Sequence, residues 1–324
     1  MQLPEISRQN LILLTGLTLL LAAFSALWML QGLPPEGNRS FILKLRWTKL
    51  AGLIVVGAAT GIATVLFQTV AGNRVLTPSI MGFDSLYVLL QTSLVMMLGI
   101  AGVAALPVGE KFLLEVGVMT LLACILFGTL LGRGARDIPR TILTGVILGI
   151  LFRSLNSFLG RVIDPIEFAV VQQNSMASFS RIDANLLPYG LGLALLAMVG
   201  AMLLASRLDV LGLGREVAVS LGLRHERVVI LTLALVAVLV AIPTALVGPI
   251  TFFGLLVAGM THGLAQTARH AILLPAAGLI AATMLVAGQL LFERVMGQAA
   301  FLSVIIEFAG GLFFMYLLLK GRIR

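Results

Sequence analysis

Long apolar runs separated by short polar segments recur along the whole of this chain. Most of the runs are about 20 residues long, the length of helix that crosses the hydrocarbon core of a bilayer, which is about 30 Å thick. Ten runs stand out, over residues 11–30, 50–70, 79–106, 112–131, 141–159, 186–205, 228–246, 248–262, 271–291 and 303–319. The pattern predicts an all-α polytopic membrane protein with about ten transmembrane helices, in a single membrane domain over residues 1–324.

Composition points the same way. Hydrophobic residues make up 59% of the 324 residues, charged residues make up 11%, and the mean hydropathy is +1.08. Soluble domains carry roughly 25% charged residues. The one cysteine, Cys124, lies in an apolar run, so there is no disulfide framework. The first apolar run is too long for a signal peptide and lacks a small-residue cleavage site, so we expect it to be a span.

The net charge of +8 reflects topology rather than a nucleic-acid partner, because the basic residues lie between the apolar runs. If both termini are cytoplasmic, most of the Lys and Arg residues fall on that side. They are Arg8, Arg74, Arg133, Arg136, Arg140, Arg207, Arg215, Arg224, Arg227, Arg269, Lys320, Arg322 and Arg324. The positive-inside rule therefore favours cytoplasmic termini.

This orientation leaves one basic cluster on the outer side. Lys44, Arg46 and Lys49 lie where the second apolar run begins. Long basic side chains at the end of a span often reach out to the membrane interface. A basic patch could also bind an acidic partner. Both interpretations stay open.

The segment 207–227, between the sixth and seventh runs, is longer than a turn requires. Its central part reads LGLGREVAVSLG over residues 211–222. Gly212 and Gly214 interrupt the backbone, and Arg215 and Glu216 then open a short helix. Three apolar side chains would lie on neighbouring faces of that helix: Val217, Ala218 and Leu221. A helix of this kind suits a groove on a partner protein, although a helical turn among the lipid headgroups fits equally well.

Two Pro/Gly breaks indicate an internal symmetry. Residues 78–82 (PSIMG) follow the second span, and residues 249–254 (PITFFG) follow the seventh. The second span runs inward and the seventh runs outward. We therefore expect spans two to five and seven to ten to form inverted repeats, as in many transporters.

The sequence has no pattern for catalysis of its own. No G-x-x-x-x-G-K-[ST] phosphate loop occurs, and no Ser/His/Asp set or zinc signature stands out. His225, His262 and His270 are not spaced with carboxylates as metal ligands. We expect a protein that is not an enzyme, with no catalytic residue, no metal site and no ATP hydrolysis by itself.

Few charged residues fall within the predicted spans, among them Asp84, Arg153 and Glu307, and Glu293 lies just after the end of one span. Charge inside a membrane is costly and usually faces a cavity or a partner. Arg153, with Asn156 nearby, is the strongest candidate for lining a transport pathway. A structural arginine, or one that reaches to the interface, is an equally open interpretation. Asp84 could instead cap a helix beside Gly82.

Five stretches together match the pattern of a known family. They are Arg46-Trp47-Thr48-Lys49, residues 57–68 with Gly57, Ala58, Gly61 and Gln68, residues 73–82 (NRVLTPSIMG), residues 213–222 (LGREVAVSLG) and residues 248–256 (GPITFFGLL). Through them the chain resembles the permease subunits of ABC importers for iron–siderophores, haem and cobalamin, the FecCD-type family. The resemblance runs from about residue 46 to residue 320.

The resemblance implies a set of partners. The permease would pair with a second copy of itself or with a paralogue, and the pathway would lie between the two. Separate ATPase subunits would carry ATP and Mg, so this chain would need no cofactor. A periplasmic binding protein would deliver the cargo to the chain, a multi-pass protein of the bacterial inner membrane.

The resemblance also implies roles for particular residues. The ATPases would receive the coupling segment 207–227 through Gly214, Arg215, Glu216, Ala218, Leu221 and Gly222. The binding protein would dock on Arg46 and Lys49. A cytoplasmic gate would be formed by Asn73, Val75, Pro78, Ile138 and Pro139.

Some positions depart from the family pattern. Ala258-Gly259 stand in place of a Pro-His pair, Arg215 stands where an acidic residue is usual, and Gln289 replaces an Asp. Together with residues 76–87 and 154–159, these departures make the chain similar to the branch of the family that is associated with catecholate-type siderophores. We therefore expect a ferric catecholate as the cargo.

Two other functions stay open. A permease for cobalamin or haem would share the same motifs. An ion-coupled secondary transporter would work without ATPases, but it needs buried carboxylates or backbone breaks arranged for ion binding. Asp84 and Glu307 are a sparse set of carboxylates for that purpose.

Overall fold

The structure is a computed structural model that describes residues 8–32, 38–134, 138–179, 182–295 and 302–319. Within these residues all the regular structure is helical, which confirms the predicted all-α class. The predicted runs correspond to α1 (Arg8–Leu30), α2 (Arg39–Ala71), α3 (Phe83–Ala105), α4 (Val108–Gly134), α5 (Ile138–Val162), α7 (Leu187–Leu203), α10 (His225–Val247), α11 (Phe253–Ala265), α12 (His270–Val295) and α13 (Leu302–Leu319).

Four shorter elements connect these helices: η1 (Pro78–Met81), α6 (Pro165–Asn174), α8 (Ala205–Leu211) and α9 (Arg215–Ser220). The pattern of apolar runs does not predict α6, because residues 160–185 mix polar and apolar positions without a long apolar run. Local signals nevertheless start that helix. The side chain of Asp164 accepts a hydrogen bond from the backbone N–H of Ile166 at 2.8 Å, and Pro165 occupies the first helical position.

Helix length and composition support a polytopic protein but do not confirm the expected number of ten spans. Among the described residues, six helices are long and apolar enough to cross a bilayer, and the pair α7 and α8, bent by 57°, would make a seventh. α11 is shorter, and so is the apolar stretch Leu302–Tyr316 of α13. A short helix can still enter a membrane where neighbouring protein covers its ends.

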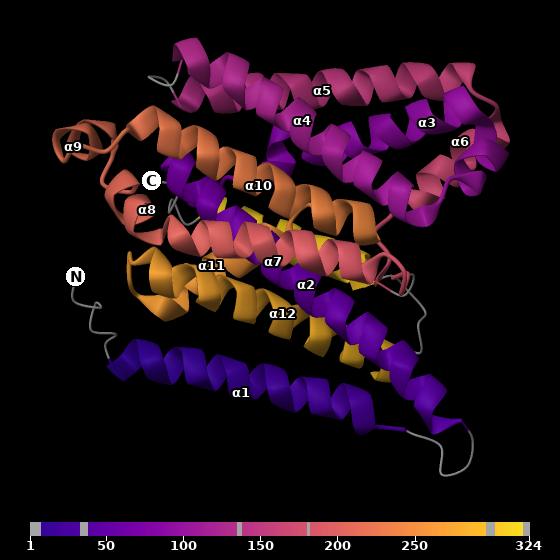
Figure 1. The fold of residues 1–324 in the computed structure, drawn as a ribbon, viewed down its shortest axis with the longest axis horizontal. Coiled ribbons are helices and arrows are strands. Elements are labelled where there is room, and N and C mark those ends of the chain that lie inside the picture. The colour runs from indigo at the N-terminus through magenta and orange to yellow at the C-terminus, as the bar shows by residue number, and fades with distance from the viewer. Residues whose placement is uncertain (1–7, 33–37, 135–137, 180–181, 296–301, 320–324) are drawn as a thin grey trace.

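α2 is the central helix of the bundle and packs most extensively against α12 and α10 (Figure 1). Glycines allow the close approach to α12. A Cβ on Gly57 would lie 2.8 Å from the backbone nitrogen of Ala282, and a Cβ on Gly61 would lie 2.6 Å from the carbonyl oxygen of Ala277. Small residues of this kind bring membrane helices into backbone contact. This packing explains the glycines of the motif at residues 57–68.

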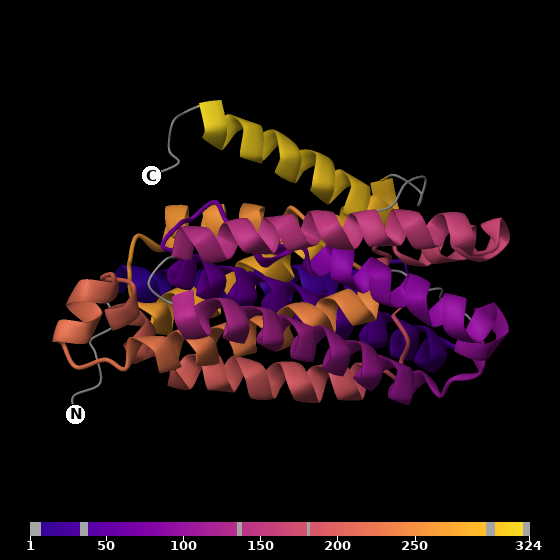
Figure 2. The ribbon, with the colours of Figure 1, turned by 90° about the horizontal axis from the view of Figure 1, so that it is seen from above.

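α1 and α13 lie on the outside of the bundle, and Figure 2 shows α13 standing apart from the other helices. α1 packs mainly against α12, and Trp28 is the buried residue on it. α13 contacts α11 and α12. α13 and α5 both expose large apolar side chains: Val304, Phe308, Leu312, Met315 and Tyr316 on α13, and Leu143, Ile147, Ile150 and Phe158 on α5. These faces suit contact with lipid or with another membrane helix.

The two ends of the bundle differ. α8 and α9 project at one end, which we call the α9 end, and α1 begins and α13 ends there too (Figures 1 and 2). α2 begins at the opposite end. The start of α1 and the end of α13 are therefore on the same side as the segment 207–227.

Candidate functional site

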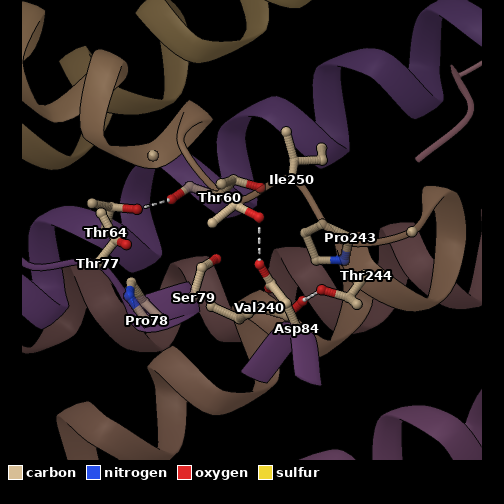
Figure 3. Close-up of a pocket in the computed structure, with 13 residues that line it drawn as sticks. Thr60, Thr64, Thr77, Pro78, Ser79, Asp84, Val240, Pro243, Thr244 and Ile250 are labelled. Carbon is tan, nitrogen blue, oxygen red and sulfur yellow. Dashed lines mark hydrogen bonds between the residues drawn. The ribbon is translucent and has the colours of Figure 1, made fainter. Parts of the chain in front are cut away.

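The two Pro/Gly breaks lie side by side in the middle of the protein. We call residues 78–82 the first break, and we call the predicted stretch 249–254 together with Gly248 just before it the second break. Gly82 and Gly248 have φ angles of +91° and +96°, a conformation that favours glycine. Both breaks line a small polar cavity of about 20 Å³, which has room for about one water molecule (Figure 3). Its polar lining consists of Thr60, Thr64, Thr77, Ser79, Asp84, Thr244 and Thr251.

A hydrogen bond joins the two breaks. The hydroxyl of Thr251 in the second break donates to Oδ2 of Asp84 at 2.8 Å (Figure 3). Asp84 lies in the first turn of α3, just after the first break, where a negative charge is favoured by the helix dipole. Gly82 is the N-cap residue of α3, so Asp84 bonds across to the second break rather than capping its own helix.

A larger cavity of about 480 Å³ lies beside the two breaks. Val146, Arg153 and Asn156 on α5 line it together with residues of both breaks and of α3: Ser79, Ile80, Gly82, Asp84, Ser85, Val88, Thr251 and Phe252. The structure thus brings the predicted pathway residues together with the predicted breaks. Asn156 also accepts a hydrogen bond from the hydroxyl of Thr92 on α3.

Glycines on α5 explain why this helix reaches the first break. A Cβ on Gly149 would lie 2.9 Å from the Cα of Gly82, and a Cβ on Gly145 would lie 2.5 Å from the Cε of Met81. Only a helix face without side chains can approach so closely. Arg153 follows Gly149 by about one helical turn, on the same side of α5. The close approach therefore brings Arg153 to the cavity.

The predicted gate residues divide into two groups. Asn73, Val75 and Pro78 lie in the connection between α2 and the first break, where Oδ1 of Asn73 accepts from the backbone N–H of Val75 at 2.9 Å. Val75 and Pro78 are buried. Ile138 and Pro139 begin α5, but their side chains lie outside the described residues.

The predicted coupling segment contains two short helices, α8 and α9. α9 begins at Arg215 as the sequence predicts, between Gly214 and Gly222, which have φ angles of +92° and +80°. The side chain of Ala218 is buried against the body, and α9 packs on α8 and α10. The outer surface of this segment carries the exposed residues Arg215, Glu216, Val217, Val219 and Leu221. This surface is partly apolar and is free to meet another protein.

Both residues of the predicted docking patch have partners within the chain. The guanidinium of Arg46 donates to the carbonyl oxygens of Met29 and Gln31 at 2.8 Å each, and so satisfies groups at the end of α1. The ammonium of Lys49 lies 3.7 Å from Oε1 of Glu293 on α12. Sequence reasoning missed this ion pair, although the opposite charges near the ends of two spans were a signal for it.

Sequence reasoning also missed Thr251 and Ser79 as cavity residues. Both are hydroxyl residues that lie one or two positions after the proline of a break. The available signal for the cavity was that each break has a hydroxyl residue just after its proline. Hydroxyl groups are common and occur in most spans, so the signal becomes specific only when the two breaks are known to face each other.

Known proteins give an independent result. The sequence matches the FecCD transport family over residues 11–320. It is 41% identical over 284 residues to the petrobactin import system permease protein YclO of Bacillus subtilis, which covers 88% of this chain and 90% of that protein. The petrobactin import system permease protein FatC of Bacillus anthracis is 32% identical over 320 residues, covering 98% and 90%.

The fold also matches a solved structure, that of an inward-facing transporter assigned to the metal-chelate ABC type. The TM-score is 0.82, the identity is 23%, and the match covers 96% of this chain and 99% of the other. At this level of identity the likeness concerns the fold.

Proposed function

Because the chain belongs to the FecCD transport family, we propose that it is the permease subunit of an ATP-driven importer that moves a ferric siderophore into the cell. As a member of this family it is a transport subunit rather than an enzyme. The two relatives named above as petrobactin permeases support a siderophore as the cargo. ATP and Mg would bind to separate ATPase subunits.

The cavity of about 480 Å³ carries this proposal. A ferric catecholate is anionic, and a charge inside the membrane needs a partner of opposite sign or a polar cavity. Arg153 supplies a positive charge, while Asn156, Ser79, Ser85 and Thr251 supply hydrogen-bonding groups. We assign this cavity to one half of the translocation pathway.

A second permease would complete the pathway. Phe252 lines the cavity, and its ring centroid lies 6.2 Å from that of Phe314 on α13. α5 and α13, which expose apolar side chains, therefore flank the cavity. The second subunit, a copy of this chain or a paralogue, would pack on these two helices and enclose the cargo between two such cavities.

The α9 end would be cytoplasmic, with both chain termini on that side and ten spans in total. An ATPase would receive the coupling segment 207–227 in a groove on its surface. The exposed residues Val217 and Leu221 would fill the groove, while the buried side chain of Ala218 seats α9 on the body. Gly214 and Gly222, with Arg215 and Glu216, would set the shape and charge of this contact.

The gate and the docking surface would lie at opposite ends. Asn73, Val75 and Pro78, with Ile138 and Pro139 at the start of α5, would close the cytoplasmic side. The periplasmic binding protein would dock near the start of α2, where Arg46 and Lys49 lie. The repeats of spans two to five and seven to ten would then tilt about the two adjoining breaks to alternate access.

Uptake of radiolabelled iron tests the function directly. Cells that lack this chain would be supplied in turn with a ferric catecholate, a ferric hydroxamate, haem and labelled cobalamin. We expect loss of ferric catecholate uptake, restored by the chain only together with its ATPase. Loss of haem or cobalamin uptake instead would identify another cargo of the same family. Rescue without any ATPase would favour an ion-coupled transporter and refute the proposal.

A further inference from the structure

A chain of hydrogen bonds joins three helices at the α9 end. Oδ1 of Asp209 on α8 accepts from the backbone N–H and from Nδ1 of His270, the first residue of α12, at 2.7 Å each. On the other side of the ring, Nε2 of His270 lies 2.7 Å from the hydroxyl oxygen of Thr69 on α2. We call Asp209, His270 and Thr69 the three-helix contact.

The chemistry of the groups fixes the end of this chain at Asp209. A carboxylate can only accept, so Nδ1 of His270 carries the hydrogen that faces Asp209. In the neutral ring, Nε2 is an acceptor, and the single hydrogen of the Thr69 hydroxyl is shared between Nε2 and the backbone oxygen of Val65, which lies 2.9 Å from the hydroxyl oxygen. The side chain of His270 is only 6% exposed, whereas that of Asp209 is 36% exposed. Asp209 also satisfies a backbone donor at the start of α12, where a negative charge is favoured.

The three-helix contact lies between the proposed coupling segment and the proposed gate. Asp209 is near the end of α8, which leads through residues 212–214 into α9. Thr69 is in the last turn of α2, which leads directly to Asn73 and the first break. Both segments line one cavity of about 300 Å³: Thr69 and Asn73 come from the side of the gate, Asp209 and Gly212 from the side of the coupling segment, and His270 lies between them.

α9 has two attachments to the body that could pass on its movement, α8 and α10. α10 packs on α2 and α4 along a mainly apolar surface, where helices can slide by small steps. A hydrogen-bonded carboxylate at a helix end resists sliding, because any shift leaves charged or polar groups without partners. α8 and the start of α12 are therefore expected to move as one body.

We propose that Asp209, His270 and Thr69 are positioning residues that carry the displacement of the coupling segment through α12 to the end of α2, and from there to the gate. The proposal rests on the proposed function, because it requires an ATPase that moves α9. It assigns the transmission to the polar contact at α8 rather than to the apolar contact at α10.

The test uses the whole importer, reconstituted in liposomes with its ATPase and binding protein, and measures iron uptake and ATP hydrolysis in parallel. Thr69→Val removes the hydroxyl and keeps the shape, whereas Thr69→Ser keeps the hydroxyl. We expect Thr69→Val to lower the iron moved per ATP hydrolysed by about tenfold, a size common for coupling between linked sites. Thr69→Ser should restore most of it.

Two changes at His270 separate the two links. His270→Asn places an amide where Nδ1 lies and keeps the link to Asp209, and His270→Gln places one near Nε2 and keeps the link to Thr69. Both should lower the iron moved per ATP, because transmission needs both links. The matched control is Thr283→Val on α12, since the hydroxyl of Thr283 bonds only to Leu279 in its own helix.

The outcomes of this experiment distinguish failure of the proposed function from failure of the proposed role of the three-helix contact. Absence of iron uptake by the wild-type importer would refute the proposed function and this inference with it. Wild-type uptake together with normal coupling in Thr69→Val and both His270 variants would refute the three-helix contact alone. A purely structural role would lower the amount of assembled importer and leave the iron moved per ATP unchanged, which would also overturn the inference.

Discussion

α2 and α5 both use glycines to approach a neighbouring backbone, but they differ in how far the rest of their surface is buried. Gly57 and Gly61 press α2 against α12, and most of the remaining surface of α2 is buried as well. Gly145 and Gly149 press α5 against the first break, while its other side exposes Ile147 and other large apolar residues. α2 is thus held from all sides, whereas α5 is attached along one face. A helix attached in this way can shift, which suits the helix that carries Arg153.

The largest expected effect is at the contact between α2 and α12. In Gly61→Val the new Cβ would lie 2.6 Å from the carbonyl oxygen of Ala277, and neither helix has room to move. Overpacking costs about 1–3 kcal/mol and sometimes more, so we expect a lower unfolding temperature in detergent and little folded protein. Gly278→Ala is the control, because its Cβ would meet Ile62 at an ordinary 3.4 Å. A Gly61→Val protein as stable as the wild type would contradict this account of α2.

Arg153 should come next, with an effect on transport rather than on folding. Arg153→Gln removes the positive charge from the cavity, and hydrogen bonds to charged groups contribute about 1.5–3 kcal/mol. Uptake of ferric catecholate at low concentration should therefore fall by about tenfold or more. Arg153→Lys should retain part of the activity. Arg161→Gln, near the end of the same helix, is the control, and equal uptake by the two Gln variants would remove Arg153 from the pathway.

Gly149→Ala should have an intermediate effect. It is the change that best distinguishes the attachment of α5 from that of α2. Its Cβ would lie 2.9 Å from the Cα of Gly82, so α5 must move away from the first break. Because no other helix of this chain covers the outer face of α5, we expect a several-fold loss of uptake by the importer, with a smaller loss of stability of the isolated subunit than in Gly61→Val. Gly117→Ala on α4, whose Cβ would meet nothing within 4 Å, serves as the control. Loss of stability without loss of uptake would show that α5 is as rigidly held as α2.

The smallest expected effect is at the ion pair of Lys49 and Glu293. The two side chains are 28% and 18% exposed, and such pairs contribute about 0.2–1 kcal/mol. A double-mutant cycle of Lys49→Gln and Glu293→Gln should give a coupling of that size in thermal unfolding. If Lys49 docks the binding protein, only Lys49→Gln should weaken binding in low salt. Equal weakening by both changes would assign the effect to the ion pair.

The sequence predicts the helices well because burial in lipid requires continuous apolar runs. The start of α9 at Arg215 was also predictable, since Gly212 and Gly214 interrupt the backbone just before it. α6 was missed because it is only ten residues long and its apolar residues form no long run, although Asp164 and Pro165 are ordinary signals for the start of a helix. The residues at the start of this helix indicated it, but a pattern of apolar runs does not take such residues into account.

The sites were less predictable, because they depend on residues far apart in the chain. Arg153 could be singled out by its charge alone, but its position beside Asp84 and Thr251 depends on how α5 packs against the breaks. The docking role of Arg46 stays a prediction, but its bonds to the end of α1 depend on how α1 and α2 meet. Apolar periodicity does not fix the rotation of one helix against another, and these contacts depend on that rotation.

The position of α1 has a consequence for the synthesis of this protein. α1 leaves the ribosome well before its main packing partner, α12, which begins only at His270. Until α12 has been inserted, α1 can pack only on the small surface that α2 offers, with Arg46 holding the end of the hairpin. α1 therefore remains mostly in contact with lipid after its own insertion, and it completes its packing only when α12 follows about 240 residues later.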